Sequence, residues 1–507
     1  MSATDHLDTT RTQVRGSSLL LSGRVLSIGV KLLTQTLIVR HLATSDYGAW
    51  AYALSVVTLL LGFAHLSFDQ SVARFASMYR EQKRDAELMG MLLLAGGTVL
   101  LSSVLLAAPV FVAPSWVRRA TSGNASVLAV LSVLIVVVPL GALDRVLVAT
   151  FATFGRTRTI FLRRYLVAPA LQLAVVVLLV ARGASVAFLT YGYVAGEALG
   201  LALYACLLVR LFREEGLLHH VSLRHITIPV REVFAFSFPL ATSDWLTAFI
   251  QSSGVLVLGY VYSTRDVALF RAVLPVALLN AAVLESFTVL FLPTASRLFA
   301  RCDVDGVNLF YWRTTVWIAV LSFPVFAVTF TLATPLSVLL FGARYAASGG
   351  VLAVLSLGFY LQAALGFNGS TLKVAGMVRF LVLINLAALV LNAALILLLV
   401  PRYGAAGAAW ALTSTLAGHN VLKQVGLRRI AGFRPVDVRF ASSFLVLAAG
   451  VMALALLRWA APSSLFILLP AVGIMALAVV GLTQRSLGIG EVFPELRRLP
   501  ILRPLLT

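Results

Sequence analysis

The sequence is poor in cysteine and in charged residues, above all acidic ones. Cys206 and Cys302 are its two cysteines; neither has a metal-ligand spacing, which excludes a disulfide scaffold and a cysteine-based metal site. Charged residues make up 12% of the 507 residues, about half the fraction of a soluble protein. With 60% hydrophobic residues, this excludes a soluble globular domain and predicts an integral membrane protein.

Motifs of enzymes are also missing. The chain has no Walker loop, Gly-rich nucleotide motif or acidic metal cluster, and His219, His220 and His225 share a loop that we interpret as a solvated basic surface. We therefore expect no enzymatic activity, no cofactor and no metal. Residues 1–16 are polar and no cleavage site follows the first apolar run, so we expect no removable signal peptide.

Long apolar runs are what the sequence does contain. They are continuous rather than alternating, which favours membrane-spanning helices over barrel strands. Fourteen runs have spanning length, and they cover residues 17–39, 47–68, 88–112, 125–143, 165–181, 185–209, 234–262, 267–290, 315–341, 350–367, 379–400, 404–422, 440–457 and 464–483. The sequence thus predicts an all-α membrane protein with about fourteen transmembrane helices.

The basic residues indicate the orientation. The formal net charge is +20, from 40 Lys and Arg against 20 Asp and Glu. With the N-terminus in the cytoplasm, 28 of the 40 cations fall in cytoplasmic segments and eight in outer ones, as the positive-inside rule requires. We predict a multi-pass plasma membrane protein with both termini cytoplasmic. The surplus charge sets topology and does not indicate a nucleic acid partner.

An internal repeat organises the helices. A shift of about 220 residues lays residues 39–53 on 259–273 and residues 75–87 on 295–307, and VLAVLSV (127–133) matches VLAVLSL (351–357). Six helices separate the equivalent segments, so both repeats keep the same orientation in the membrane. The repeat predicts two parallel six-helix lobes around a central cavity, followed by two additional helices.

These features predict six segments along the chain, and a monomer is sufficient for the two-lobe arrangement. They are a cytoplasmic N-terminal tail (1–16), an N-lobe (17–212), a cytoplasmic linker (213–233), a C-lobe (234–430), the last two helices (431–484) and a cytoplasmic C-terminal tail (485–507).

Residues 383–419 carry a family resemblance. Asn385 and Asn392 precede Pro401-Arg402-Tyr403-Gly404 and Gly407-Ala408-Ala409; residues 36–53, 292–300 and 340–345 fit the same pattern. The chain resembles the polysaccharide-transporter branch of the multidrug/oligosaccharidyl-lipid/polysaccharide (MOP) exporter superfamily, including O-antigen and lipid II flippases. A structural interpretation of Pro401 to Gly404 is that it ends one helix and lets the next pack closely.

The resemblance implies a flippase that moves a lipid-linked oligosaccharide or polysaccharide precursor from the cytoplasmic to the outer leaflet by alternating access. Its partners would be a lipid-linked glycan bearing a pyrophosphate or another anion, membrane lipids and a coupling H⁺ or Na⁺. The alternative is a cation-coupled multidrug exporter of the same superfamily. The sugar, the lipid carrier and a tail-binding role for the last two helices are left open.

Cations at membrane depth are costly and suggest function. Arg24 and Lys31 stand seven residues apart, two helical turns, and so project from one face. We expect them to bind an anionic substrate, with Arg271 as a third cation. Arg24 could instead extend to the headgroups. Arg271 could instead pair with Asp266 or extend outward to the membrane surface.

Acidic residues within the helices suggest a role in coupling transport to an ion gradient. Asp244 is the repeat equivalent of Arg24, and we expect it to act as a counter-ion or coupling group; it could instead cap a helix start after Pro239. Glu285 could bind a coupling ion or be a protonated structural residue. Glu197 could serve helix packing, and the adjacent Asp144 and Arg145 are interpreted as a helix-end pair at the cytoplasmic surface.

Overall fold

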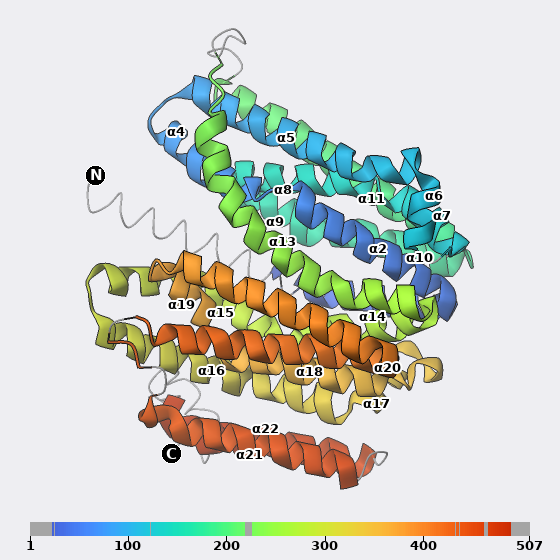
Figure 1. Ribbon diagram of the computed structural model, residues 1–507, viewed down its shortest axis with the longest axis vertical. Coiled ribbons are helices and arrows are strands. Elements are labelled where there is room, and N and C mark those ends of the chain that lie inside the picture. Colours follow the sequence, from blue (N-terminus) through green and yellow to red (C-terminus); the bar gives the residue numbers. More distant parts are fainter. Residues whose placement is uncertain are drawn as a thin grey trace. The chain divides into compact units, whose positions relative to one another are not determined.

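The chain folds into helices throughout the part of it that the structure describes. The computed structural model (Figure 1) describes residues 23–24, 26–121, 123–217, 226–430, 432–434, 437–460 and 465–487, and no strand occurs among them. Twelve helices in these ranges are long and apolar enough to span a membrane. In lipid a backbone must satisfy its own hydrogen bonds, which helices do within one segment. The predicted all-helical membrane fold is confirmed.

The chain divides into two compact units, residues 1–268 and residues 269–507. The helices of the first unit include short π-helical segments, η1 and η2. Beyond a helix over residues 26–41, they are α2 (Thr44–Ala64), α3 (Phe68–Ser71), η1 (Val72–Ala76), α4 (Ser77–Glu81), α5 (Asp85–Val112), α6 (Pro114–Ala120), α7 (Ala125–Leu134), α8 (Val137–Thr153), α9 (Thr157–Phe161), η2 (Leu162–Val167), α10 (Ala168–Ala181), α11 (Val186–Glu214) and α13 (Val230–Val261).

The second unit begins within α14 (Thr264–Leu278). Its other helices include three 3₁₀ turns, η4, η5 and η6. They are η4 (Leu279–Ala281), α15 (Ala282–Ala300), α16 (Val304–Thr331), α17 (Ala333–Phe341), η5 (Ala343–Tyr345), α18 (Ser348–Ala364), α19 (Asn368–Val374), α20 (Val378–Leu427), η6 (Val438–Phe440), α21 (Ala441–Ala460) and α22 (Leu465–Leu487).

The number of spanning helices is close to the expected fourteen. The 50-residue α20 contains two helices that meet at Gly404, whose φ of 54° and ψ of −131° are non-helical, as Pro401 to Gly404 predicts. The first expected helix, over 17–39, starts outside the described residues. The expected helix over 315–341 is wrong in its bounds, because α16 starts after the N-cap Asp303 and ends before Leu332, where α17 follows. Fourteen stays a prediction.

Helix α13 packs along α2 in the first unit (Figure 1). A small residue allows the close approach, because a Cβ on Gly259 of α13 would overlap the ring of Tyr52 in α2. Gly48 of α2 does the same for the start of α14, where its Cβ would overlap the carbonyl oxygen of Thr264. Because α13 packs on α2, the compact units divide at residue 268. The lobes predicted from the sequence repeat divide earlier, at the 213–233 linker. The lobe bounds stay a prediction.

Equivalent positions of the repeat fall at equivalent places in the helices. Asp46 and Asp266 lie in the first turns of α2 and α14, and Asp85 and Asp305 in those of α5 and α16. The two VLAVLS segments lie in α7 and α18. The sequence repeat is thus a repeat of helices.

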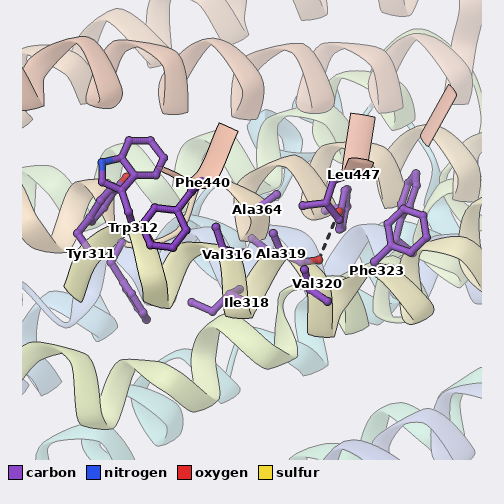
Figure 2. Close-up of a cluster of buried hydrophobic side chains, with 14 of the residues drawn as sticks. Tyr311, Trp312, Val316, Ile318, Ala319, Val320, Phe323, Ala364, Phe440 and Leu447 are labelled. Atoms are coloured by element: carbon purple, nitrogen blue, oxygen red, sulfur yellow. Dashed lines mark hydrogen bonds between the residues drawn. The ribbon is translucent and has the colours of Figure 1, made fainter. Parts of the chain in front are cut away.

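The core of the second unit centres on α16 (Figure 2). Tyr311, Val316 and Phe323 of α16 are at most 1% exposed and pack with Phe440 and Leu447, which come from η6 and the start of α21. α22 packs on α16 as well. The last two spanning helices are therefore an integral part of the second unit.

Candidate functional site

Two of the three predicted substrate cations, Arg24 and Lys31, lie in the first unit. Arg24 is half-buried in the helical stretch over 23–24, and Lys31 is exposed in the helix over 26–41. The charged groups that act on Lys31 are Arg164, Glu197 and Arg24, so the predicted pair shares one electrostatic environment with an additional cation. Lys31 makes no ion pair with any residue that the structure describes. A net positive potential results at Lys31.

A buried arginine in the first unit forms ion pairs with two carboxylates of this region. Arg163 lies in η2, and its side chain is 4% exposed. Its Nη2 lies 3.2 Å from Asp144 Oδ1 and 3.5 Å from Glu197 Oε2, while Gln172 donates to Glu197 Oε1 at 3.3 Å. Because Arg163 engages both acids, neither is fully available to neutralise Lys31.

Residue type and backbone geometry make room for this guanidinium. It lies where a Cβ on Gly200 would stand, so a larger residue at that position of α11 would require the guanidinium to shift away from its two acids. It also lies 5.5 Å from the ring centroid of Tyr204, within cation–π range. The π-helical segment η2 adds an extra residue to the turn that carries Arg163, a feature frequent at functional sites.

A second polar cluster surrounds Asp244. Ser67 donates to Asp244 Oδ2 at 2.5 Å and Gln70 at 3.3 Å, and His65 Nε2 lies 3.7 Å from the same oxygen. Asp244 stands well inside α13, whose N-cap is Pro229. The alternative that Asp244 caps a helix start is therefore wrong.

The break between α2 and α3 forms this cluster. Leu66 and Ser67 have left-handed backbones, with φ of 49° and 55°, which is uncommon outside glycine. The helix direction changes there, and the hydroxyl of Ser67 reaches Asp244. Broken helices with strained backbones recur at the binding sites of transporters.

Asp144 and Arg145 connect the two clusters. Asp144 pairs with Arg163, while Arg145 Nη1 lies 3.4 Å from His65 Nε2. Both stand inside α8, so the interpretation as a helix-end pair is wrong: the two side chains of this dipeptide turn to different partners on other helices. Two sets of polar contacts, Glu197–Arg163–Asp144 and Arg145–His65–Asp244, are thus joined by the backbone between Asp144 and Arg145.

His65 has two charged neighbours on the same side of its ring, Arg145 and Asp244. Its Nδ1 lies 3.1 Å from the carbonyl of Leu61, which can only accept a hydrogen bond, so Nδ1 carries the hydrogen. In neutral His65, Nε2 is then an acceptor for Arg145. The same Nε2 lies 3.7 Å from Asp244 Oδ2, so His65 stands between Arg145 and Asp244.

The other predicted site residues lie in the second unit. Arg271 is half-buried in α14, and Glu285 is exposed in the first turn of α15. The 3₁₀ turn η4 separates the helices that carry them. The pairing of Arg24 with Asp244 stays a prediction.

Comparisons with known proteins agree with the fold. The family model described as polysaccharide biosynthesis protein matches residues 37–349. No curated protein matches the chain. Among solved structures, the lipid II flippase MurJ in an inward closed conformation superposes with a TM-score of 0.73 at 12% identity, covering 92% of this chain and 99% of that one.

Two additional structures share the fold. An inward-facing multidrug resistance MATE transporter of the MOP superfamily has a TM-score of 0.63 at 12% identity and covers 81% of this chain and 96% of its own. A MOP superfamily transporter from Pyrococcus furiosus, whose binding pocket is described as reversed in polarity, has a TM-score of 0.57 at 15% identity, with 82% and 93% covered. The resemblance found in the sequence is confirmed.

Proposed function

The chain belongs to the polysaccharide biosynthesis protein family, and from this premise we propose that it is a flippase for a lipid-linked oligosaccharide or polysaccharide precursor. It carries this substrate from the cytoplasmic to the outer leaflet of the plasma membrane by alternating access, with both termini in the cytoplasm. No covalent bond changes in this process, so the protein acts as a transporter and not as an enzyme. MurJ, which shares this fold, is a lipid II flippase, and this supports the same substrate class.

One observation carries the substrate assignment. Lys31 is exposed and acted on by Arg24 and Arg164, while the carboxylates of Asp144 and Glu197 contact the buried Arg163. Such a surface attracts an anion and repels a cation. Lys31 and Arg24 would hold the pyrophosphate or an acidic sugar through charge-assisted hydrogen bonds, and Arg271 would act as a third cation.

The multidrug exporter is the second candidate, and the MATE structures support it in fold. A cationic drug needs accessible carboxylates. In the first unit, Asp144 and Glu197 contact Arg163, and Asp244 accepts from Ser67 and Gln70. These contacts engage the carboxylates that a cationic drug would need, which favours the flippase.

Transport by reconstituted variants tests the substrate site. Lys31→Gln and Arg24→Gln are each expected to slow the flipping of a lipid-linked sugar in proteoliposomes by about tenfold, which corresponds to about 1.4 kcal/mol of lost binding. Lys83→Gln removes an exposed cation from the turn between α4 and α5 and should leave the rate unchanged. Undiminished flipping by both properly inserted variants would refute the assignment. Export of a cationic dye without flipping would favour the exporter.

Ion coupling is also part of the proposal, with Asp244 as the coupling group and Glu285 as the alternative. The contacts of Asp244 with His65 and Ser67 support a proton as the coupling ion, because carboxylates and histidines inside membrane-spanning segments recur in proton relays. Asp244→Asn should abolish the dependence of flipping on an imposed pH gradient, whereas Glu285→Gln should retain it. The opposite outcome would move the coupling role to Glu285, and a response to Na⁺ alone would exclude the proton.

A further inference from the structure

A short helix, α6, joins the ends of two spanning helices and carries two arginines. α5 ends at Val112 and α7 begins at Ala125, so α6 lies at one boundary of the apolar layer. Arg118 and Arg119 are both exposed in it. They line a cavity of about 640 Å³ together with Pro114, Ser115, Gly123 and Leu128.

The backbone around this cavity is fixed by local hydrogen bonds. Gly123, with a φ of 71°, donates from its N–H to the carbonyl of Arg118 at 2.7 Å. The hydroxyl of Thr121 donates to the carbonyl of Val117 at 3.0 Å, and Asn124 caps α7 through Ser126 and Val127. The cavity is thus a formed feature between α6 and the start of α7.

Neither arginine forms an ion pair with an acid in the part of the chain that the structure describes. α5 and α7 are the helices packed against α6, and residues 88–143 contain no Asp or Glu. Glu87, at the other end of α5, is 25 residues from Val112, about 38 Å along a helix. No ion pair of Arg118 or Arg119 occurs among the described residues. The described residues thus place two adjacent cations on α6 without a neighbouring carboxylate.

The surroundings of the two cations are apolar and exposed. Trp116 is 71% exposed, Val112 83% and Phe111 59%. An exposed tryptophan beside arginines at the end of a spanning helix is typical of the membrane interface, where the ring lies at headgroup level. The site therefore offers an apolar surface for acyl chains next to two donors for a phosphate.

From these observations we propose that α6 and its cavity bind the phosphate of an anionic phospholipid in the leaflet that α6 contacts. Arg118 and Arg119 donate to the phosphate oxygens, and Trp116 with the end of α5 contacts the upper acyl chains. The positive-inside count assigns α6 to the outer side, so the lipid belongs to the outer leaflet. The bound lipid would hold the α5–α7 connection at the interface, independently of any transported substrate.

Lipid binding by the purified full chain tests this proposal. Native mass spectrometry would titrate phosphatidylglycerol and phosphatidylcholine onto wild type and onto the double variant Arg118→Gln, Arg119→Gln. We expect at least fivefold weaker phosphatidylglycerol binding in the variant and no change with phosphatidylcholine. Arg118→Lys, Arg119→Lys keeps the charge and should retain most of the binding.

A matched control separates this site from a general loss of charge. The double variant Arg182→Gln, Arg402→Gln removes two other exposed arginines assigned to the outer side and should bind phosphatidylglycerol within twofold of wild type. Equal loss in both double variants, or no loss in the first, would overturn the proposal. Displacement of the lipid by millimolar inorganic phosphate would also overturn it, because the ligand would then be a soluble phosphate.

Discussion

At the scale of single residues, Arg163 is the charge whose environment is most defined. It is 4% exposed and lies between Asp144 and Glu197, which come from two other helices. The net stabilisation by a buried ion pair is small, because desolvation opposes the Coulomb attraction. Loss of one partner is different, since it leaves the other charges buried and uncompensated. Arg163 is therefore a position where substitution should be severe.

Arg163→Gln should lower the free energy of unfolding by about 3 kcal/mol, within the range for breaking a buried pair. Thermal unfolding in detergent would measure the change. Arg210→Gln is the matched control, because Arg210 is 77% exposed at its side chain and pairs with Glu214 one turn away; an exposed pair of this kind contributes about 0.5 kcal/mol or less. Equal effects of the two substitutions would contradict the buried network.

Gly200→Ala tests the same contact from the opposite side. The added Cβ would occupy the position of the Arg163 guanidinium, and overpacking of this kind costs about 1–3 kcal/mol. Gly196→Ala, one turn earlier on α11, places its Cβ 4.0 Å from the Cβ of Leu171 and should be harmless. If the guanidinium is the obstacle, Gly200→Ala should cost clearly less in an Arg163→Ala background, which unfolding of the double variant would show.

At the scale of elements, the breaks in the helices are as informative as the helices. α2 ends at the strained Leu66 and Ser67, and η2 carries Arg163; both irregular segments bring polar groups of the first unit together. The break at Gly404 has a different role, because it turns the chain between two apolar segments of α20. There, a Cβ on Gly407 would overlap the carbonyl of Leu399, so the turn is tight.

Gly404→Ala should destabilise the protein by about 1–3 kcal/mol, because its φ of 54° with ψ of −131° is a conformation that side chains with a Cβ rarely adopt. Gly350→Ala in α18 is the control: its Cβ meets no atom within 4 Å, and alanine favours a helix over glycine. Melting temperatures in detergent would compare the two. A neutral Gly404→Ala would show that the turn accepts another backbone conformation.

At the scale of the whole molecule, the prediction to test is the orientation in the membrane. Cys302 is exposed in the α15–α16 turn, which the basic residues assign to the cytoplasm, and α6 is assigned to the outside. In a Cys206→Ala chain, a membrane-impermeant maleimide should not label Cys302 on intact cells and should label it after permeabilisation. In a cysteine-free chain with Ser115→Cys in α6, it should label intact cells. The reverse pattern would invert the topology and place α6 in the inner leaflet.

The membrane class, the helical fold and the family could be inferred from the sequence because each depends on local or repeated features. A spanning helix must be apolar along its own length, and Asp46, Asp266 and the VLAVLS segments recur at a nearly constant offset. Gly404 indicated a turn for the same reason, because the ability to adopt a positive φ is a local property of glycine.

The contacts of Arg163, Asp144, Arg145 and His65 could not be predicted from the sequence, because the partners lie far apart in the chain. Asp144 and Arg145 are neighbours in the chain, which suggested a local pair, yet one contacts Arg163 and the other His65. Arg163 follows a connection that the basic residues assign to the cytoplasm, and in that count it is one more topological cation. Only the packing of η2 against Gly200 buries it, because burial depends on which helix faces lie against one another, and a hydropathy pattern does not specify that.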